Sequence, residues 1–453
     1  MFTIYFHKKA PLYEQIYSHI VQEIQEGRIQ SQEKLPSQRS LAQHLGVGLN
    51  TVKLAYEQLL LEGYIVSKER SGFYVDLLMA DRLKGQKKER EIEIPEKISY
   101  KWDFSYHAID KDRLPLWVME KSMGKSMEKA VFSKGKEKGG TWSLRKELAH
   151  YLARRRGLEV NPRNILITSG YGESLFLLLS VLKHPIFSTE NPGYTKTLKI
   201  IQSFTEEIHS IPLDKYGFSV ADLEQTNSNV AVVTPNHQFP TGMVMGIRRR
   251  QRLLEWARKK EDRYIIEDDY DGDFSYSSKP IPPLKGMDID DRVIFSGTFS
   301  QSIGPFVGIS YIVLPEILRK RFENMYIPIL GASPLLEYFL EEFLSSGDFD
   351  RHVNRMNNLY RKKNEKIRKL LREKVDFEIL GQEMGLHFLL RVHSFFGNPL
   401  EIEEQGKKKG IKIESLHRYE KDGKRLQDFI IGFGGIPLEK MEEAVKDLEE
   451  LFP

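Results

Sequence analysis

Hydrophobic residues near the N-terminus recur at the three- and four-residue spacing of an α-helix. The first run follows Pro11, and its apolar positions are Leu12, Ile16, Ile20, Val21 and Ile24. Gly27 ends this run, because glycine readily takes the left-handed conformation that stops a helix. A second helix is predicted to begin at Ser37, whose hydroxyl can cap the first turn, and to end at Gly46.

A third run and a pair of strands complete this pattern. The run begins near Asn50 and ends before Gly63, and its apolar positions are Val52, Tyr56, Leu59 and Leu60. Two β-prone runs follow, Tyr64–Ser67 and Phe73–Val75, separated by a short turn. Three short helices closed by a hairpin outline a winged helix-turn-helix, in which the third helix enters the major groove of DNA.

The pattern changes after residue 78. Residues 79–100 are charged, mixed in sign and poor in large apolar groups, which indicates a solvated linker; a binding segment is the alternative. From residue 101 onward, strand-like and helix-like runs alternate, which predicts an α/β domain with a mainly parallel sheet. The strand candidates are Asn164–Thr168, Val230–Thr234, Tyr264–Glu267, Arg292–Phe295 and Ser310–Leu314.

Helical candidates lie between these strands and beyond them. Ser143–Arg156 and Glu173–Leu182 are examples, and His352–Glu373 is a long amphipathic stretch. The end of the chain, from about 340 to 453, is predicted to form a small α+β subdomain. The predicted organisation is therefore 1–78 as a DNA-binding domain, 79–100 as a linker and 101–453 as one large domain.

Composition limits the chemistry that is available. None of the 453 residues is a cysteine, which excludes disulfides, thiolate metal sites and cysteine nucleophiles, and no metal site is predicted. We find no signal peptide and no run of 18 apolar residues, so the expected location is the cytoplasm, without a membrane partner. The run Arg248-Arg249-Arg250 is expected on a solvated helix face.

Charge alone does not indicate nucleic acid, because the net charge is only +4. The placement of hydrogen-bond donors, by contrast, does indicate a nucleic-acid partner. Arg39 leads the second helix, and the third begins with Asn50, Thr51 and Lys53, all of which can donate to phosphates or base edges of double-stranded DNA.

Residues 11–75 resemble the GntR-type winged-helix domain through LPSQR, LAQHLGV, NTV, AYEQL and EGY, in that order. One departure is Leu49, which follows Gly48 where the family commonly has Ser-Arg before Asn-Thr-Val. A lost arginine contact costs about 1–3 kcal/mol of affinity or discrimination. A winged helix used only for dimerisation or protein contacts is the alternative.

The large domain carries a second set of ordered motifs. ILITSGYGESL is a strand that runs into a helix, where backbone amides can hold an anion. ENPGY, TPNHQFPTG, YIIEDDYDGDF and FSGTFSQSIGP follow. Together they resemble the fold-type I aminotransferase-like domain of the MocR subfamily of GntR regulators. This resemblance implies a homodimer and pyridoxal 5'-phosphate as the family's cofactor.

The resemblance also assigns residues to the cofactor pocket. Asp268 would pair with the pyridine nitrogen and Tyr270 would donate to the ring hydroxyl. His237, in the TPNHQFPTG loop, is interpreted as structural rather than as an acid–base group. The full set of pocket positions is Gly170, Tyr171, Tyr194, Asp268, Tyr270 and Thr298.

Three positions depart from the family's pattern. Gln301 stands where the family has the lysine that holds the cofactor, and an amide nitrogen cannot form a Schiff base because its lone pair is delocalised. Gly308 replaces the arginine that binds the phosphate, and Glu173 lies at the helix start where a phosphate would sit. No catalytic residue and no covalent cofactor are therefore expected.

The leading hypothesis is a sequence-specific DNA-binding transcription regulator. Its catalytically inactive large domain would serve for dimerisation and for sensing a small-molecule effector. One alternative is a pyridoxal-phosphate-dependent enzyme, or a regulator that binds the cofactor non-covalently. Another is a scaffold that binds no DNA.

Overall fold

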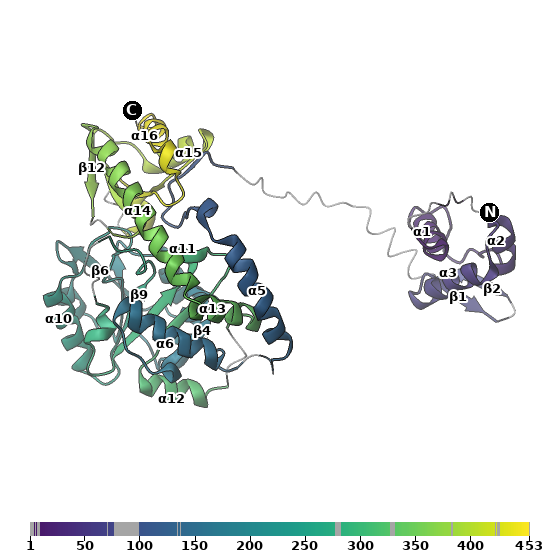
Figure 1. Ribbon diagram of the computed structural model, residues 1–453, viewed down its shortest axis with the longest axis horizontal. Coiled ribbons are helices and arrows are strands. Elements are labelled where there is room, and N and C mark those ends of the chain that lie inside the picture. The colour runs from purple at the N-terminus through teal and green to yellow at the C-terminus, as the bar shows by residue number, and fades with distance from the viewer. Residues whose placement is uncertain are drawn as a thin grey trace. The chain divides into compact units, whose positions relative to one another are not determined.

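The computed structural model describes residues 4, 6, 10–69, 71–76, 99–133, 135, 137–276, 282–326, 331–381, 384–421, 423 and 426–452. Spatial contacts divide the chain into two units, Met1–Ile98 and Ser99–Pro453, and the elements of each are labelled in Figure 1. The predicted linker, 79–100, lies outside the described residues except for its last two positions.

The N-terminal unit has three helices and a hairpin: α1 (Leu12–Gln25), α2 (Gln38–Leu45), α3 (Leu49–Leu61), β1 (Ile65–Lys68) and β2 (Gly72–Val75). The two strands are antiparallel. Ser37 caps α2 by accepting a hydrogen bond from the Ser40 amide at 3.2 Å, and Gly46 ends it at φ 65°. One apolar face of each helix is buried in a common core, which includes Ile16, Ile20, Leu41, Val52, Tyr56 and Leu59.

A mixed, mostly parallel sheet of eight strands forms the centre of the second unit, in the order β4-β11-β10-β9-β8-β5-β6-β7. Neighbours from β10 to β6 are parallel, whereas β11, β4 and β7 pair antiparallel. The strands are β4 (Ile165–Thr168), β5 (Phe187–Asn191), β6 (Ile208–Asp214), β7 (Gly217–Phe218), β8 (Val230–Val233), β9 (Tyr264–Asp269), β10 (Val293–Thr298) and β11 (Ser310–Val313).

Helices cover both faces of this sheet, because alternate strand residues point to opposite sides. In β9, Ile265 packs in the cluster that includes α10 (Ile247–Arg258), whereas Ile266 packs in the cluster that includes α7 (Tyr171–Val181). The other helices around the sheet are α5 (Leu116–Val131), α6 (Trp142–Arg156), α8 (Thr195–Gln202), α9 (Val220–Glu224), α11 (Ser300–Ile303), α12 (Glu316–Asn324) and α13 (Pro334–Ser345).

A second sheet, with the order β12-β13-β16-β15, belongs to the C-terminal part of this unit. Its strands and helices are β12 (Phe377–Leu380), β13 (His387–Val392), β15 (Glu414–Ser415), β16 (Asp428–Gly432), α15 (Pro399–Lys408) and α16 (Met441–Glu449). A short parallel pair joins β3 (Trp102–Asp103) to β14 (Ile411–Lys412). The fold class is therefore α/β, as predicted.

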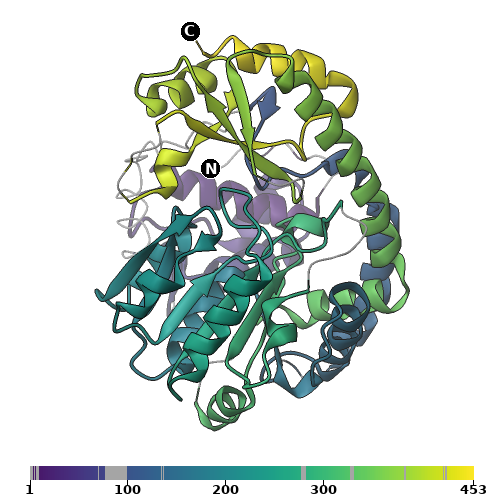
Figure 2. The same ribbon diagram turned by 90° about the vertical axis from the view of Figure 1, so that its left-hand side faces the viewer.

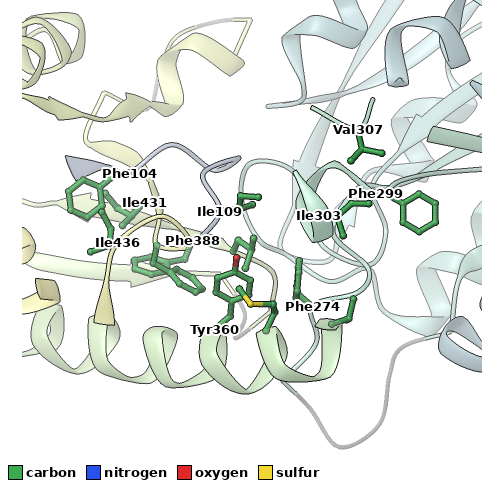
Figure 3. Packing of buried hydrophobic residues seen from close by; sticks show 14 of the residues in the cluster. Phe104, Ile109, Phe274, Phe299, Ile303, Val307, Tyr360, Phe388, Ile431 and Ile436 are labelled. Carbon is green, nitrogen blue, oxygen red and sulfur yellow. The ribbon is translucent and has the colours of Figure 1, made fainter. Parts of the chain in front are cut away.

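The helix α14 (Asp348–Arg372) connects the two sheets. Figure 2 shows it running along one side of the unit between them. Its buried residue Tyr360 packs edge-on against Phe274, with ring centres 5.1 Å apart. Figure 3 shows this pair beside Phe388 of β13, so one apolar core serves both sheets.

The prediction for the arginine run was wrong at Arg250, which is only 2% exposed. Its guanidinium donates to the carbonyl oxygens of Met245, Pro235 and Pro282 at 2.8–2.9 Å, so it links the start of the TPNHQFPTG loop to the segment after that loop and to residue 282. Within the described part of the chain, no helix combines the length and apolarity needed to cross a membrane.

Candidate ligand site and DNA-reading face

A cavity of about 180 Å³ opens where the strands β5, β8 and β9 end. Ligand sites of parallel α/β sheets form at this edge, because the strands of such a sheet all end there. The lining includes Thr189, Glu190 and Asn191 of β5, Asp268 of β9, Tyr171 of α7, Tyr194, and Arg418 to Lys421 from the C-terminal part of the chain.

Two carboxyl groups give this cavity its electrostatic character. Burial, together with the neighbouring carboxylates of Asp269 and Glu190, raises the pKa of Asp268 to about 8. Burial also raises the pKa of Glu190 to about 7, although hydrogen bonds from Thr234 and Gln238 act against it. Both groups therefore change protonation near neutral pH, and each can donate or accept a hydrogen bond there.

Two tyrosines form aromatic walls of the cavity. The Tyr171 hydroxyl lies 2.8 Å from the Thr197 hydroxyl and also hydrogen-bonds Asp268. The Tyr194 hydroxyl accepts a hydrogen bond from Tyr106 at 3.2 Å, and its ring meets Phe239 edge-on. The Asp268 carboxyl therefore already has a hydrogen-bond partner on the wall of the cavity, the Tyr171 hydroxyl.

Glu173 turns back over the start of α7. Its carboxylate accepts hydrogen bonds from the amide of Ser169 and, at 2.8 Å, from the amide of Gly331. Gly170 is the N-cap of this helix at φ 132°, a conformation that favours glycine. A side-chain carboxylate thus takes up two nearby backbone donors and places a negative charge beside the N-terminus of α7, which would otherwise attract an anion.

Gln301 lies on the short helix α11 and is only 8% exposed. Its Oε1 atom is buried without a hydrogen-bond partner among the described residues. Thr298, the last residue of β10, has its hydroxyl 3.0 Å from that of Ser300. Gly308 lies nearby at φ 58°, and a Cβ atom there would be 3.8 Å from the carbonyl oxygen of Ser169.

Tyr270 faces a different group of residues. Its hydroxyl lies 3.0 Å from Nδ1 of His237, which in turn lies 2.6 Å from Asp271. Burial lowers the pKa of the adjacent His387 well below its usual range. Half-buried Tyr270 and the buried side chains of His237 and His387 form a cluster between the large sheet and β13.

The cavity therefore brings together three of the predicted positions, Tyr171, Tyr194 and Asp268. Gly170, Tyr270, Thr298 and Gln301 are not among the residues that line it. Sequence reasoning missed Glu190 as a site residue although it stands in ENPGY; a carboxylate directly after a buried run was the available signal. No feature of the local sequence indicates that Tyr419 and Lys421 also line this cavity.

The N-terminal unit presents the predicted DNA-reading side chains to solvent. Arg39 on α2 is exposed, as are Asn50 and Lys53 on the first turns of α3, whereas Thr51 is half-buried. Gly48 is the N-cap of α3, so the helix starts with two residues that offer no side-chain donor. The unit thus has the layout of a winged helix-turn-helix with its polar residues at the N-terminal end of the third helix.

Comparisons with known families agree with both units. Residues 12–75 match the family of bacterial regulatory proteins of the gntR type, and residues 132–394 match aminotransferase class I and II. An archaeal alanine:glyoxylate aminotransferase of known structure superposes with a TM-score of 0.71 at 26% identity, over 78% of this chain and 90% of that one. The large unit therefore has the aminotransferase fold.

Two relatives are similar over almost the whole length. The uncharacterized HTH-type transcriptional regulator YdeL of Bacillus subtilis (strain 168) is 36% identical over 97% of this chain and 96% of its own. The probable rhizopine catabolism regulatory protein MocR of Rhizobium meliloti is 28% identical over 98% and 94%. These matches define a class: DNA-binding transcription regulators with an aminotransferase-like domain. The chain belongs to the MocR subfamily of the GntR regulators.

Proposed function

We propose that this regulator does not catalyse transamination, and that its large unit instead forms a homodimer and binds a small-molecule effector. The observation that carries the proposal is the residue set at the cofactor position: Gln301, Gly308 and Glu173. Gln301 removes the covalent interaction that pyridoxal phosphate would need, and Gly308 and Glu173 both act against binding of its phosphate.

The covalent interaction is the first to be lost. Schiff-base formation needs an amine nucleophile, and the amide nitrogen of Gln301 is not one, because its lone pair is delocalised into the carbonyl. The Oε1 atom of Gln301, which has no hydrogen-bond partner in the described part of the chain, is an acceptor rather than a nucleophile. The residues at this position therefore do not fit a covalently held cofactor.

The interaction with the phosphate of the cofactor is the second to be lost. Gly308 offers no guanidinium, and loss of a charged hydrogen bond of this kind costs about 1.5–3 kcal/mol. Glu173 already binds the amides of Ser169 and Gly331, so a phosphate dianion would meet a negative charge and occupied donors. These residues do not fit a phosphate either.

The cavity that remains favours another ligand class. Asp268 and Glu190 are acceptors when ionised, and Tyr171 and Tyr194 add aromatic surface. We therefore infer a polar effector that exchanges hydrogen bonds with these carboxyl groups and packs against the tyrosine rings, and that is not held through a phosphate. Binding would act on DNA recognition by favouring one of two placements of the DNA-binding units.

Exposed apolar side chains support dimerisation. On and next to α5, Trp117 is 73% exposed, Val131 70% and Phe132 82%. Large apolar groups that gather on one helix at a surface commonly mark an interface. We assign this surface to a second copy of the chain, so that two DNA-reading helices meet a repeated operator. Light scattering of Trp117→Glu against the wild type tests this assignment.

The cofactor part of the proposal is tested with the purified full-length protein and pyridoxal phosphate. The expected spectrum is that of the free aldehyde, with no borohydride-reducible adduct in the cavity. An aldimine absorption band, with the borohydride-reduced adduct mapped to a lysine of the cavity, would overturn the proposal that the large unit is catalytically inactive. Saturable binding without reduction would instead identify a regulator that holds the cofactor non-covalently.

The DNA part is tested by footprinting the region upstream of the protein's own gene. Arg39→Ala and Lys53→Ala are expected to weaken protection by about tenfold or more, since each removes an exposed donor of the reading face. Arg28→Ala is the matched control, because Glu23 and Glu26 already pair with this arginine. Absence of protection by the wild type at any tested site would favour the scaffold alternative.

A further inference from the structure

Two buried histidines and a buried aspartate meet between the two sheets of the large unit. His237 lies in the loop after β8, Asp271 follows β9, and His387 is the first residue of β13. They are 2%, 6% and 1% exposed, and one potential ligand atom from each lies within 4.8 Å of the others. We propose that this cluster binds a divalent transition-metal ion, Zn²⁺ in particular, which ties the two sheets together.

One ring nitrogen of His387 has no hydrogen-bond partner among the described residues. This imidazole bonds the backbone of Pro240, yet its Nε2 atom is buried without a partner among the described residues. His237 is also hydrogen-bonded through only one of its ring nitrogens. Its Nδ1 atom contacts Asp271 and Tyr270, whereas its Nε2 atom has no partner within the described chain. Buried side-chain nitrogens nearly always have a partner, and an imidazole fixed through one nitrogen is typical of metal ligands.

The donor set suits the proposed ion. Two imidazoles and one carboxylate are common ligands of Zn²⁺, with bonds of about 2.0–2.2 Å. Donors on one tetrahedral ion lie about 3.4 Å apart. The ligand atoms of the cluster, which lie within 4.8 Å of one another, would therefore have to draw together by up to about 1.4 Å.

Gly385 keeps the required space open. A Cβ atom at this position would lie 2.1 Å from the Asp271 carboxylate and 2.5 Å from Nδ1 of His237. Any side chain there would therefore displace the pair. His237 and Asp271 come from the large sheet and His387 from the small one, so an ion would resist their separation. This inference does not depend on the fate of the cofactor position.

The test uses full-length protein without a polyhistidine tag, stripped with a chelator and then titrated with ZnCl₂. The expected result is one Zn²⁺ per chain and a melting temperature that rises with Zn²⁺ concentration by mass action. Co²⁺ in the same site should give visible d–d absorption that Zn²⁺ abolishes.

Two variants and a control locate the site. His387→Ala is expected to weaken binding at least about 100-fold, and Asp271→Asn, which keeps the size of the side chain, about 10-fold or more. His150→Ala, at a histidine whose side chain is 66% exposed, should bind as the wild type does. The proposal fails if the wild type takes up no stoichiometric zinc or cobalt, or if Asp271→Asn binds with unchanged affinity. Unchanged affinity of Asp271→Asn would refute the proposed metal site even if His387→Ala does not fold.

Discussion

Replacement of Asp268 by asparagine should change how the stability of the large unit depends on pH. The pKa of this carboxyl is raised from 3.8 to about 8, chiefly by burial. The folded protein thus holds a proton that the unfolded chain releases between about pH 4 and pH 8. Stability therefore falls as the pH rises through this window, by up to about 1.4 kcal/mol per pH unit from this group.

The variant Asp268→Asn removes this titration and keeps an acceptor for Tyr171. At about pH 4, where the carboxyl is protonated in the folded protein and only half ionised in the unfolded chain, its melting temperature should be close to that of the wild type. From pH 5 to pH 7 its stability advantage over the wild type should grow by up to about 2.7 kcal/mol, which for a unit of this size is a shift of a few °C, roughly 1–4 °C. Differential scanning calorimetry at pH 4, 5, 6, 7 and 8 measures this difference.

The control is Asp290→Asn, at an exposed position. Its melting temperature should differ from that of the wild type by the same small amount at every pH. A difference between Asp268→Asn and the wild type that stays constant from pH 5 to pH 8 would show that Asp268 is ionised throughout. A difference that reverses sign would refute the assignment of burial as the dominant cause.

Three further predictions concern other parts of the chain. Lys53→Ala should weaken DNA binding across sequences and lower the slope of log K against log salt by about 1, as measured by fluorescence anisotropy. Asp269→Ala should destabilise the large unit by about 3–5 kcal/mol in urea unfolding, because the buried Arg156 guanidinium, now 2.7 Å from that carboxylate, loses this charged partner and keeps only the carbonyl of Gly272; an unchanged midpoint would contradict this. Glu173→Ala should make sulfate stabilising in thermal shift assays, whereas the wild type should not respond, because the freed amides can bind an anion.

Local sequence patterns determined much of the fold. The capping hydroxyl of Ser37 and the left-handed glycine at 46 act within a few residues, so the ends of α2 followed from the sequence. The five predicted strands correspond to β4, β8, β9, β10 and β11, since buried strands read as continuous apolar runs. The strands β5 and β6 were not predicted, because polar residues interrupt them.

Only the tertiary structure decided which side chains meet. Arg250 looked solvated within an arginine run, yet loop carbonyl groups that surround it stabilise it in the interior. Tyr171 and Lys421 line one cavity, and His237 and His387 share one cluster, although each pair is far apart in sequence. Periodicity reports which face of an element is buried, but strand order and helix packing determine what lies opposite that face. For this reason the residue types at the cofactor position were readable from the sequence, whereas their surroundings were not.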